Sequence, residues 1–531
     1  MTNYINPKQP SASLTSALSI LFKLILLGMI GVFIIASGFA ASQGKLLYVI
    51  AAFPIIIGVI MSFSYTTLLL VSIFGGMVVA GLAQLYVPQL ELIRWAFTAS
   101  ATLLIFHIAF QALKTSTPKF SIDSAILFWL LVFLIILCLS GTIQNISLNA
   151  ITISLKGYLQ VWGVLFALAL LPFKPKDMDK LPAFILFISL TQVPFVLHQY
   201  FVLVPIRKGI NDVAGLVPID IVTGTFGGKM NHGGANAALT ILCFITGCGL
   251  TALWKNKVIA TKYFLGLLFL VMFPAFLNST KISIIYLFIA LLIIFSDEFL
   301  INPLKFLSKL AVTVLLCLLL AISVISTMPE NSDISSLSDL YEHTYNYNVA
   351  QDNIRDNRLS RSGSIKAWFD PVKPHDYKEL MIGYGIGSSR MVDTSAGRRI
   401  SSIINLEEAT GVTAIAAILW ETGIIGLLTV FALFAIAFQV ASRLKHIYRD
   451  NLYRTSIFTS LQCSVLILFV SLAHKNFFVY HIGFQTLFVT IFGYLAYWER
   501  VANKERLSLI NEGTLRQQAK LDYGLDYDYY D

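Results

Sequence analysis

Apolar stretches long enough to cross a bilayer recur along almost the whole chain, and no other feature constrains the fold as strongly. A transmembrane helix needs about 20 mostly apolar residues. Of the 531 residues, 56% are hydrophobic and only 13% are charged. About fourteen stretches meet the length requirement. They cover residues 16–40, 46–63, 66–86, 94–113, 124–142, 155–172, 181–204, 236–254, 262–278, 282–297, 307–327, 412–441, 455–473 and 477–498. The sequence predicts an all-α polytopic membrane protein, and its first stretch is too long for a cleavable signal peptide.

The loops between these stretches form two alternating sets that differ in charge. Lys and Arg concentrate in one set, which comprises residues 114–119, 174–180, 255–262, 305–309, 443–454 and the tail 499–531. Loops rich in Lys and Arg stay in the cytoplasm, so we expect this set and both termini to be cytoplasmic. The net charge of +9 is then a topology signal and does not indicate nucleic-acid binding.

The other set contains both long loops, which we expect outside the cytoplasmic membrane. The chain then divides into residues 1–327, with eleven spans and the external loop 205–235, a large external loop at 328–411, three spans within 412–498, and the tail. The five cysteines all lie in apolar stretches without metal-ligand spacing. They indicate neither a disulfide framework nor a metal site.

The large loop carries basic residues in a pattern that fits phosphate binding. Arg355, Arg358 and Arg361 follow one another at three-residue spacing, which places them on one face of a helix. Guanidinium groups bind phosphate bidentately and keep their charge when partly desolvated. We expect a helix to continue over 360–369, with Trp368 on its apolar face.

The sequence G-Y-G-I-G-S-S-R follows in the same loop and ends at Arg390. It neither follows a clear strand nor opens a βαβ unit, so it is not a dinucleotide-binding fingerprint. We expect a tight turn that packs the loop back on the membrane. Tyr384 in this turn and Trp368 can stack on sugar faces, although core packing is the more common role of an aromatic side chain.

The shorter outer loop has a basic start and a glycine-rich end. Arg207 and Lys208 can bind a phosphate at the outer leaflet or anchor the helix end by snorkelling. The later sequence G-G-K-M-N-H-G-G contains Lys229 and His232. Its glycines let the backbone approach a ligand closely, and it precedes a predicted helix whose first amides can face an anion. A re-entry turn without a ligand is the alternative.

Three further charged residues stand close to apolar stretches. Lys281 lies in the short outer turn N-S-T-K, where it can hold one ammonium beside a diphosphate or cap the helix by snorkelling. Glu408 precedes the span that begins near residue 412, and Glu421 lies inside it. A carboxylate whose pKa is raised by burial suits general-base catalysis. A solvated helix start is the alternative role for Glu408.

These segments, in this order, resemble the superfamily of O-antigen ligases and Wzy-type polysaccharide polymerases. N-S-T-K is similar to the family's T-x-S-R-like turn, with Lys281 in place of the usual Arg. The family's Arg…Trp…G-x-G-x-G stretch resembles R-S-G-S-I-K-A-W together with L-M-I-G-Y-G-I-G-S in this chain. Its E-x-G segment is similar to L-W-E-T-G-I-I-G-L-L. Ligases of the family typically carry His-Asn before that segment, whereas this chain has I-I-N-L-E-E-A-T-G. The polymerase assignment is therefore favoured over the ligase.

The resemblance implies a metal-independent glycosyltransferase of the GT-C type without a cofactor. Its implied partners are a polyprenyl-diphosphate-linked glycan as donor, a lipid-linked or lipid A-core glycan as acceptor, membrane lipids, and a chain-length regulator or flippase. We expect Arg207, Lys281 and Arg361 to bind the diphosphate, and Glu408 or His232 to act as the base. A transporter of an anion or lipid-linked sugar and a scaffold protein are the alternatives, although no internal repeat of the kind common in transporters is apparent.

Overall fold

Every element of the described part of the chain is helical. The computed structural model describes residues 64–114, 124–210, 217–231, 234–278, 280–326, 336–345, 348–349, 360–369, 377–389 and 413–523. The first half contains α3 (Tyr65–Phe74), α4 (Ala80–Tyr86), α5 (Arg94–Lys114), α6 (Ala125–Ile143), α7 (Leu148–Leu159), α8 (Trp162–Leu170), α9 (Pro175–Met178), α10 (Leu181–Leu190), α11 (Gln192–His198), α12 (Val204–Lys208) and α13 (Asn236–Lys255). The second half contains α14 (Thr261–Leu277), α15 (Ser283–Ile294), α16 (Ser296–Ile301), α17 (Pro303–Ser326), α18 (Leu337–Tyr345), α19 (Arg361–Phe369), α20 (Tyr377–Ile382), α22 (Ala414–Ile447), α23 (Leu452–Ser471), α24 (Phe477–Tyr480) and α25 (Ile482–Tyr523).

The described helices include seven that are long and apolar enough to cross a membrane, or eight if the bent pair α7 and α8 forms one span. Two shorter apolar helices, α14 and α15, coincide with two further predicted stretches. The composition and the helix lengths therefore indicate a multi-pass membrane protein. The count of fourteen is not confirmed, and its first two members, 16–40 and 46–63, lie outside the described residues. The last predicted stretch, 477–498, ends in the structure as part of α25, which continues as one helix to Tyr523.

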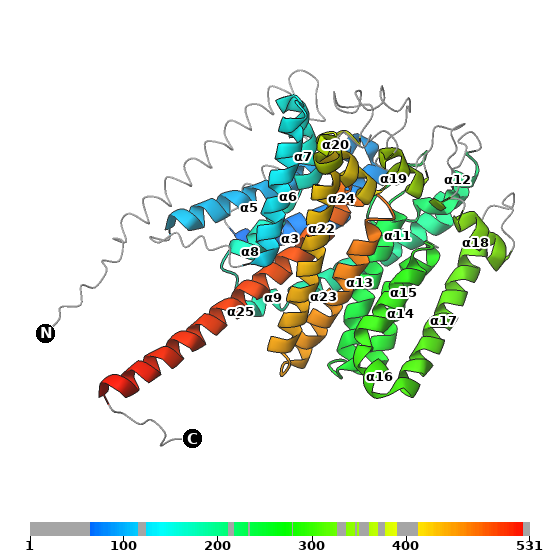
Figure 1. The fold of residues 1–531 in the computed structure, drawn as a ribbon. Coiled ribbons are helices and arrows are strands. Elements are labelled where there is room, and N and C mark those ends of the chain that lie inside the picture. The colour runs from blue at the N-terminus through cyan, green and yellow to red at the C-terminus, as the bar shows by residue number, and fades with distance from the viewer. Residues whose placement is uncertain are drawn as a thin grey trace.

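The helices form a bundle in which α22, α23 and α13 pack side by side at the centre (Figure 1). α6 packs against α22, and α8 packs between α5 and the start of α25. One end of the bundle carries α12, α19, α20 and α24, and we call it the loop end. α25 extends from the bundle toward the opposite side of the molecule (Figure 1).

The Lys- and Arg-rich loops of the sequence gather at the other end, which we call the basic end. Arg454, in the first turn of α23, forms an ion pair with Asp179 at 3.1 Å and joins the start of that helix to the α9–α10 connection. Lys255 pairs with Asp297 at 3.1 Å and joins the end of α13 to α16. These contacts bring loops from distant parts of the sequence to one end. Three of the Lys- and Arg-rich connections within the described residues, at 174–180, 255–262 and 443–454, thus take part in contacts at this end.

A break in α22 accommodates the glycine-rich turn of the large loop. Gly423 has φ +64° and ψ −161° inside the helix, and Gly383 in the turn has φ +76°. The two residues face each other, because a Cβ added to Gly383 would lie 2.6 Å from the Gly423 nitrogen. The carbonyl of Trp420, left without its helical partner, accepts from the Tyr384 N–H at 2.8 Å and the Ser388 hydroxyl at 2.9 Å. The predicted tight turn is present, and it packs into a helix break.

Glu421 connects this break to three other elements. Its carboxylate is buried and accepts a hydrogen bond from the Tyr158 hydroxyl of α7 at 2.9 Å and another from the Ser389 hydroxyl. Ser389 also lies 3.0 Å from the Tyr480 hydroxyl of α24. The cost of burying a carboxylate is thereby offset by directed donors. Glu421 therefore joins the turn, α7 and α24 to α22.

We predict that Gly383→Ala or Gly423→Ala destabilises the protein, because each adds a Cβ against backbone at a left-handed φ. The expected loss is roughly 1–3 kcal/mol, the range for strained backbone conformations. Thermal unfolding of the detergent-solubilised protein measures the effect. Gly266→Ala is the matched control, since no atom lies within 4 Å of a Cβ at this position in α14. Equal unfolding midpoints for all three variants would contradict the role of the two glycines.

Candidate functional site

A buried arginine and a carboxylate lie close together at the loop end. Arg207, the fourth residue of α12, is only 1% exposed, so its side chain does not snorkel toward water. Asp220, in the 3-10 turn Pro218–Ile221, is close enough to Arg207 for an electrostatic interaction. Asp220 Oδ1 accepts a hydrogen bond from Asn236 Nδ2 at 3.0 Å. The start of α13 therefore fixes the carboxylate beside Arg207.

The turn that carries Lys281 is held on the same end of α13. Asn278 Nδ2 donates to the Asn236 carbonyl at 3.1 Å and to the Thr240 hydroxyl at 2.9 Å. The Asn278 Oδ1 accepts from the Thr280 N–H at 3.2 Å and fixes the turn internally. The Lys281 side chain is partly buried in this turn. One residue, Asn236, thus positions both Asp220 and the Lys281 turn.

Arg361 is placed by the start of α19. Ser360 caps this helix, since its hydroxyl accepts from the Gly363 N–H at 2.8 Å. Trp420 of α22 donates through its indole N–H to the Ser364 carbonyl at 3.2 Å and holds α19 against the bundle. The partly buried Arg361 donates through Nη1 to the Asn348 side chain. The cap and the indole contact together fix the start of α19 and therefore the position of Arg361, its first residue.

Four cations at this end are connected by electrostatic interactions, Arg207 through Asp220, and we call them the cationic cluster: Arg207, Lys281, Arg361 and Lys475. Arg361 interacts electrostatically with Lys281 and with Lys475, and Asp220 interacts with Lys475 as well as with Arg207. Burial lowers the pKa of the Lys281 ammonium, and the nearby Arg361 charge lowers it further. Burial and Arg361 also lower the pKa of Lys475, against the opposing effect of Asp220. Neighbouring cations repel one another, and this repulsion makes protonation of each lysine less favourable. A bound anion offsets the repulsion, so such a cluster favours anion binding.

The sequence analysis missed one segment of this site. His474 and Lys475 lie in the short connection between α23 and α24, and both interact with the Arg361 charge. Lys475 Nζ donates to the Gly234 carbonyl at 3.4 Å, next to the start of α13. The signal was present in the sequence, because H-K-N separates the stretches 455–473 and 477–498 on the predicted outer side. Like Lys281, Lys475 is a lysine in a short predicted outer turn, so the same sequence criterion identifies it.

The remaining predicted site residues have other positions. Lys208 and Lys229 are exposed, in contrast to Arg207. The proposed sugar-stacking role of Trp368 and Tyr384 is not supported, because they are 0% and 6% exposed and pack with Trp420 in one apolar cluster. These rings are buried because they pack the large loop against Trp420 of α22. Five predicted residues lie outside the described part of the chain: His232, Arg355, Arg358, Arg390 and Glu408.

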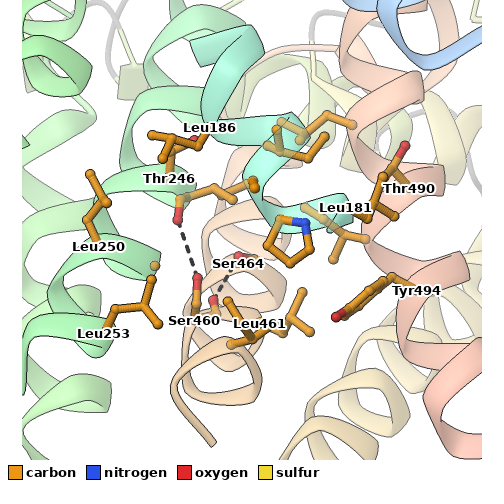
Figure 2. Close-up of a pocket in the computed structure, with 18 of the residues that line it drawn as sticks. Leu181, Leu186, Thr246, Leu250, Leu253, Ser460, Leu461, Ser464, Thr490 and Tyr494 are labelled. Atoms are coloured by element: carbon orange, nitrogen blue, oxygen red, sulfur yellow. Dashed lines mark hydrogen bonds between the residues drawn. The ribbon is translucent and has the colours of Figure 1, made fainter. Parts of the chain in front are cut away.

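An apolar cavity of about 180 Å³ lies between α10, α13, α23 and α25, away from the cationic cluster (Figure 2). Leucine side chains such as Leu186 and Leu250 line much of it, and Tyr494 closes one side (Figure 2). Hydroxyl groups in its walls already bind backbone carbonyls: Thr246 donates to the Leu242 carbonyl at 2.9 Å, Ser464 to the Ser460 carbonyl at 2.8 Å, and Ser460 to the Ile245 carbonyl of α13 at 3.4 Å. The walls therefore provide few polar groups that could bind a charged ligand, and the cationic cluster is the better candidate site.

Within the described ranges, no three His, Cys, Asp or Glu side chains form a group that could hold a metal ion. The sequence also matches no protein-family model, and no curated protein matches it. The chemistry of the cationic cluster is therefore the main indication of what the protein does.

Proposed function

We propose that this protein is a bacterial polysaccharide polymerase of the GT-C type that transfers a glycan from a polyprenyl diphosphate to a sugar hydroxyl of a lipid-linked acceptor. The observation that supports it most is the convergence of Arg207, Lys281, Arg361 and Lys475 at one end of an apolar helical bundle. A polyprenyl diphosphate has the matching chemistry, because it combines two phosphates with a long apolar chain. The fourteen-span topology of the sequence analysis belongs to the same proposal.

The reaction requires stabilisation of the negative charge that develops on the departing diphosphate. Fixed cations can provide this charge stabilisation when they are positioned before the reaction begins. Arg361 and Arg207 supply planar guanidinium groups that suit phosphate oxygens, and the two ammonium groups supply compact charges. Asp220 and Asn236 hold part of this arrangement in place. In this proposal the four cations bind the donor diphosphate and stabilise it as the leaving group.

The orientation of the protein follows from charge. The basic end collects the Lys- and Arg-rich connections, so the positive-inside rule assigns it to the cytoplasm. The cationic cluster then faces the outside of the inner membrane, where it meets an outward-facing lipid-linked glycan. A ligase that transfers the glycan to lipid A-core has the same donor and the same site requirements, and the product distinguishes the two enzymes.

A transporter is the second candidate, and the break in α22 favours it. Transporters often bind substrate at discontinuous helices, and α22 has non-helical backbone at Gly423 beside the buried Glu421. In this chain, however, the Tyr384 N–H and the Ser388 hydroxyl already bind the Trp420 carbonyl freed at the break. The break has a structural explanation within the chain, and the enzyme remains the favoured proposal.

The lipid-linked glycans of a deletion strain test the proposed function. We expect single repeat units to accumulate on the polyprenyl carrier, because the polymerase joins such units. Long polymers on the carrier would assign the ligase reaction instead. Re-expression of the intact gene is the control, and it should restore the parental pattern. Normal surface glycan without accumulation of either lipid would contradict both enzyme assignments.

The proposed orientation predicts opposite labelling of two engineered cysteines. Lys366 on α19 is exposed at the loop end, and Lys180 is exposed at the basic end. In a variant without the five native cysteines, Lys366→Cys should react with an impermeant thiol reagent in intact cells, and Lys180→Cys should react only after the membrane is opened. The reverse pattern would place the cationic cluster in the cytoplasm and exclude an outward-facing donor.

We expect Arg361→Ala to lower glycan transfer by about a hundred- to a thousandfold, or roughly 2.7–4 kcal/mol, by analogy with the removal of an oxyanion-hole donor. Arg361→Lys should also lose much of the activity, because an ammonium lacks the planar fork. Turnover at saturating lipid donor is the measurement.

Lys366→Ala is the matched control for Arg361, since it removes an exposed charge from the same helix. An exposed charge contributes about 0–1 kcal/mol, so its turnover should change only a few-fold. Near-normal turnover of Arg361→Ala would remove this residue from the donor site.

A further inference from the structure

The connection between α23 and α24 adds a proton acceptor to the cationic cluster. His474 lies three residues after Ser471, the last residue of α23, and its backbone N–H donates to the Ser471 carbonyl at 3.0 Å. The residue is half-buried, and it lies close enough to Arg361 and Lys475 for electrostatic interaction. Among the described residues, the imidazole thus stands beside the groups that would bind the diphosphate.

A second histidine near the cluster has a different role. His481 lies within electrostatic range of Lys475, but both of its ring nitrogens are occupied. Its Nδ1 accepts from the Phe484 N–H at 3.1 Å, so its Nε2 carries the proton and donates to the Phe226 carbonyl at 2.9 Å. This imidazole joins α25 to the segment after α12. For the His474 ring, the structure gives no hydrogen bond to any described residue, so its ring nitrogens remain available.

The charges around His474 favour the neutral imidazole that a base requires. Burial lowers the pKa of His474 well below its ordinary value, and the Arg361 and Lys475 charges lower it further. Two further charges face these neighbours, since Lys281 interacts with Arg361 and Asp220 with Lys475. A bound diphosphate offsets the cations and raises the pKa again. His474 therefore becomes a stronger base when the donor is in place.

We propose that His474 accepts the proton of the acceptor hydroxyl during glycan transfer, an inference that rests on the proposed function. The hydroxyl oxygen forms a bond to the anomeric carbon while its O–H bond breaks and the proton passes to a ring nitrogen of His474. The bond between the anomeric carbon and the phosphate oxygen breaks, and its electron pair leaves with the polyprenyl diphosphate. The imidazolium then releases the proton to water, so no further reactant is consumed.

The test compares His474→Gln with the unmodified enzyme in transfer between purified lipid-linked repeat units. A general base contributes about a hundred- to ten-thousandfold to the rate, and we expect kcat to fall within that range. The dissociation constant for polyprenyl diphosphate should change by no more than a few-fold, since the four cations remain. His446→Gln, at the exposed end of α22, is the matched control and should keep normal turnover.

The pH profile separates a base from a structural residue. In the unmodified enzyme, kcat should be low at acid pH, rise as the imidazole loses its proton, and then stay constant, because only the neutral ring accepts a proton. The residual kcat of His474→Gln should not show this rise. In His474→Ala, added imidazole should restore part of the activity, and this rescue provides the test even if Gln disturbs the connection.

Three outcomes would overturn the proposal. They are a kcat of His474→Gln close to that of the unmodified enzyme, a variant profile that retains the same rise with pH, and a failure of imidazole to restore activity to His474→Ala. Absence of glycan transfer by the unmodified enzyme is a different result, because it refutes the proposed function and the role of His474 with it.

Discussion

Hydrogen bonds from buried side chains to irregular backbone are the interactions on which this structure depends. A polar group left unpaired in an apolar interior costs about 1–3 kcal/mol, and in lipid non-helical backbone is tolerated only where the protein pairs it. The segment after α12 is buried, and Gln199 meets this requirement there. Its Oε1 accepts from the N–H groups of Thr223 and Gly224 at 2.9 and 2.7 Å, and its Nε2 donates to the Gly224 carbonyl at 2.6 Å.

The same principle fixes the other parts of the loop end. Gln192 accepts from the Thr225 N–H at 2.8 Å, the Asn236 side chain donates to Asp220, and the Glu421 carboxylate accepts from Ser389 of the glycine-rich turn. Each polar side chain comes from a helix and binds a segment that is not part of that helix. As a result, the cationic cluster is assembled from connections, yet its members are attached to rigid elements. Such attachment is what a preorganised anion site requires.

Sequence reasoning located much of this site from charge at the ends of apolar stretches. The positions of the basic residues in the sequence are enough to predict that Arg207, Lys281 and Arg361 share a site. In the structure, Lys281 lies within electrostatic range of Arg361. Lys475 was missed because its connection is only a few residues long and resembles an ordinary break between spans. Trp368 and Tyr384 were considered as sugar platforms because their sequence surroundings are polar. Whether an aromatic ring in a polar loop faces water or the bundle is decided by its neighbours in space, here Trp420.

The sequence by itself determined that the chain is a helical multi-pass membrane protein and that its loops form two alternating sets that differ in charge. Both properties follow from local composition, because an apolar stretch of sufficient length forms a helix in lipid wherever it occurs. Only the tertiary structure decided that Arg207 is buried near Asp220, that the glycine-rich turn packs into a break in α22, and that His474 lies beside Arg361. These relations join residues tens to hundreds of positions apart, and their geometry depends on how the helices pack and on which side chains bind the irregular backbone between them.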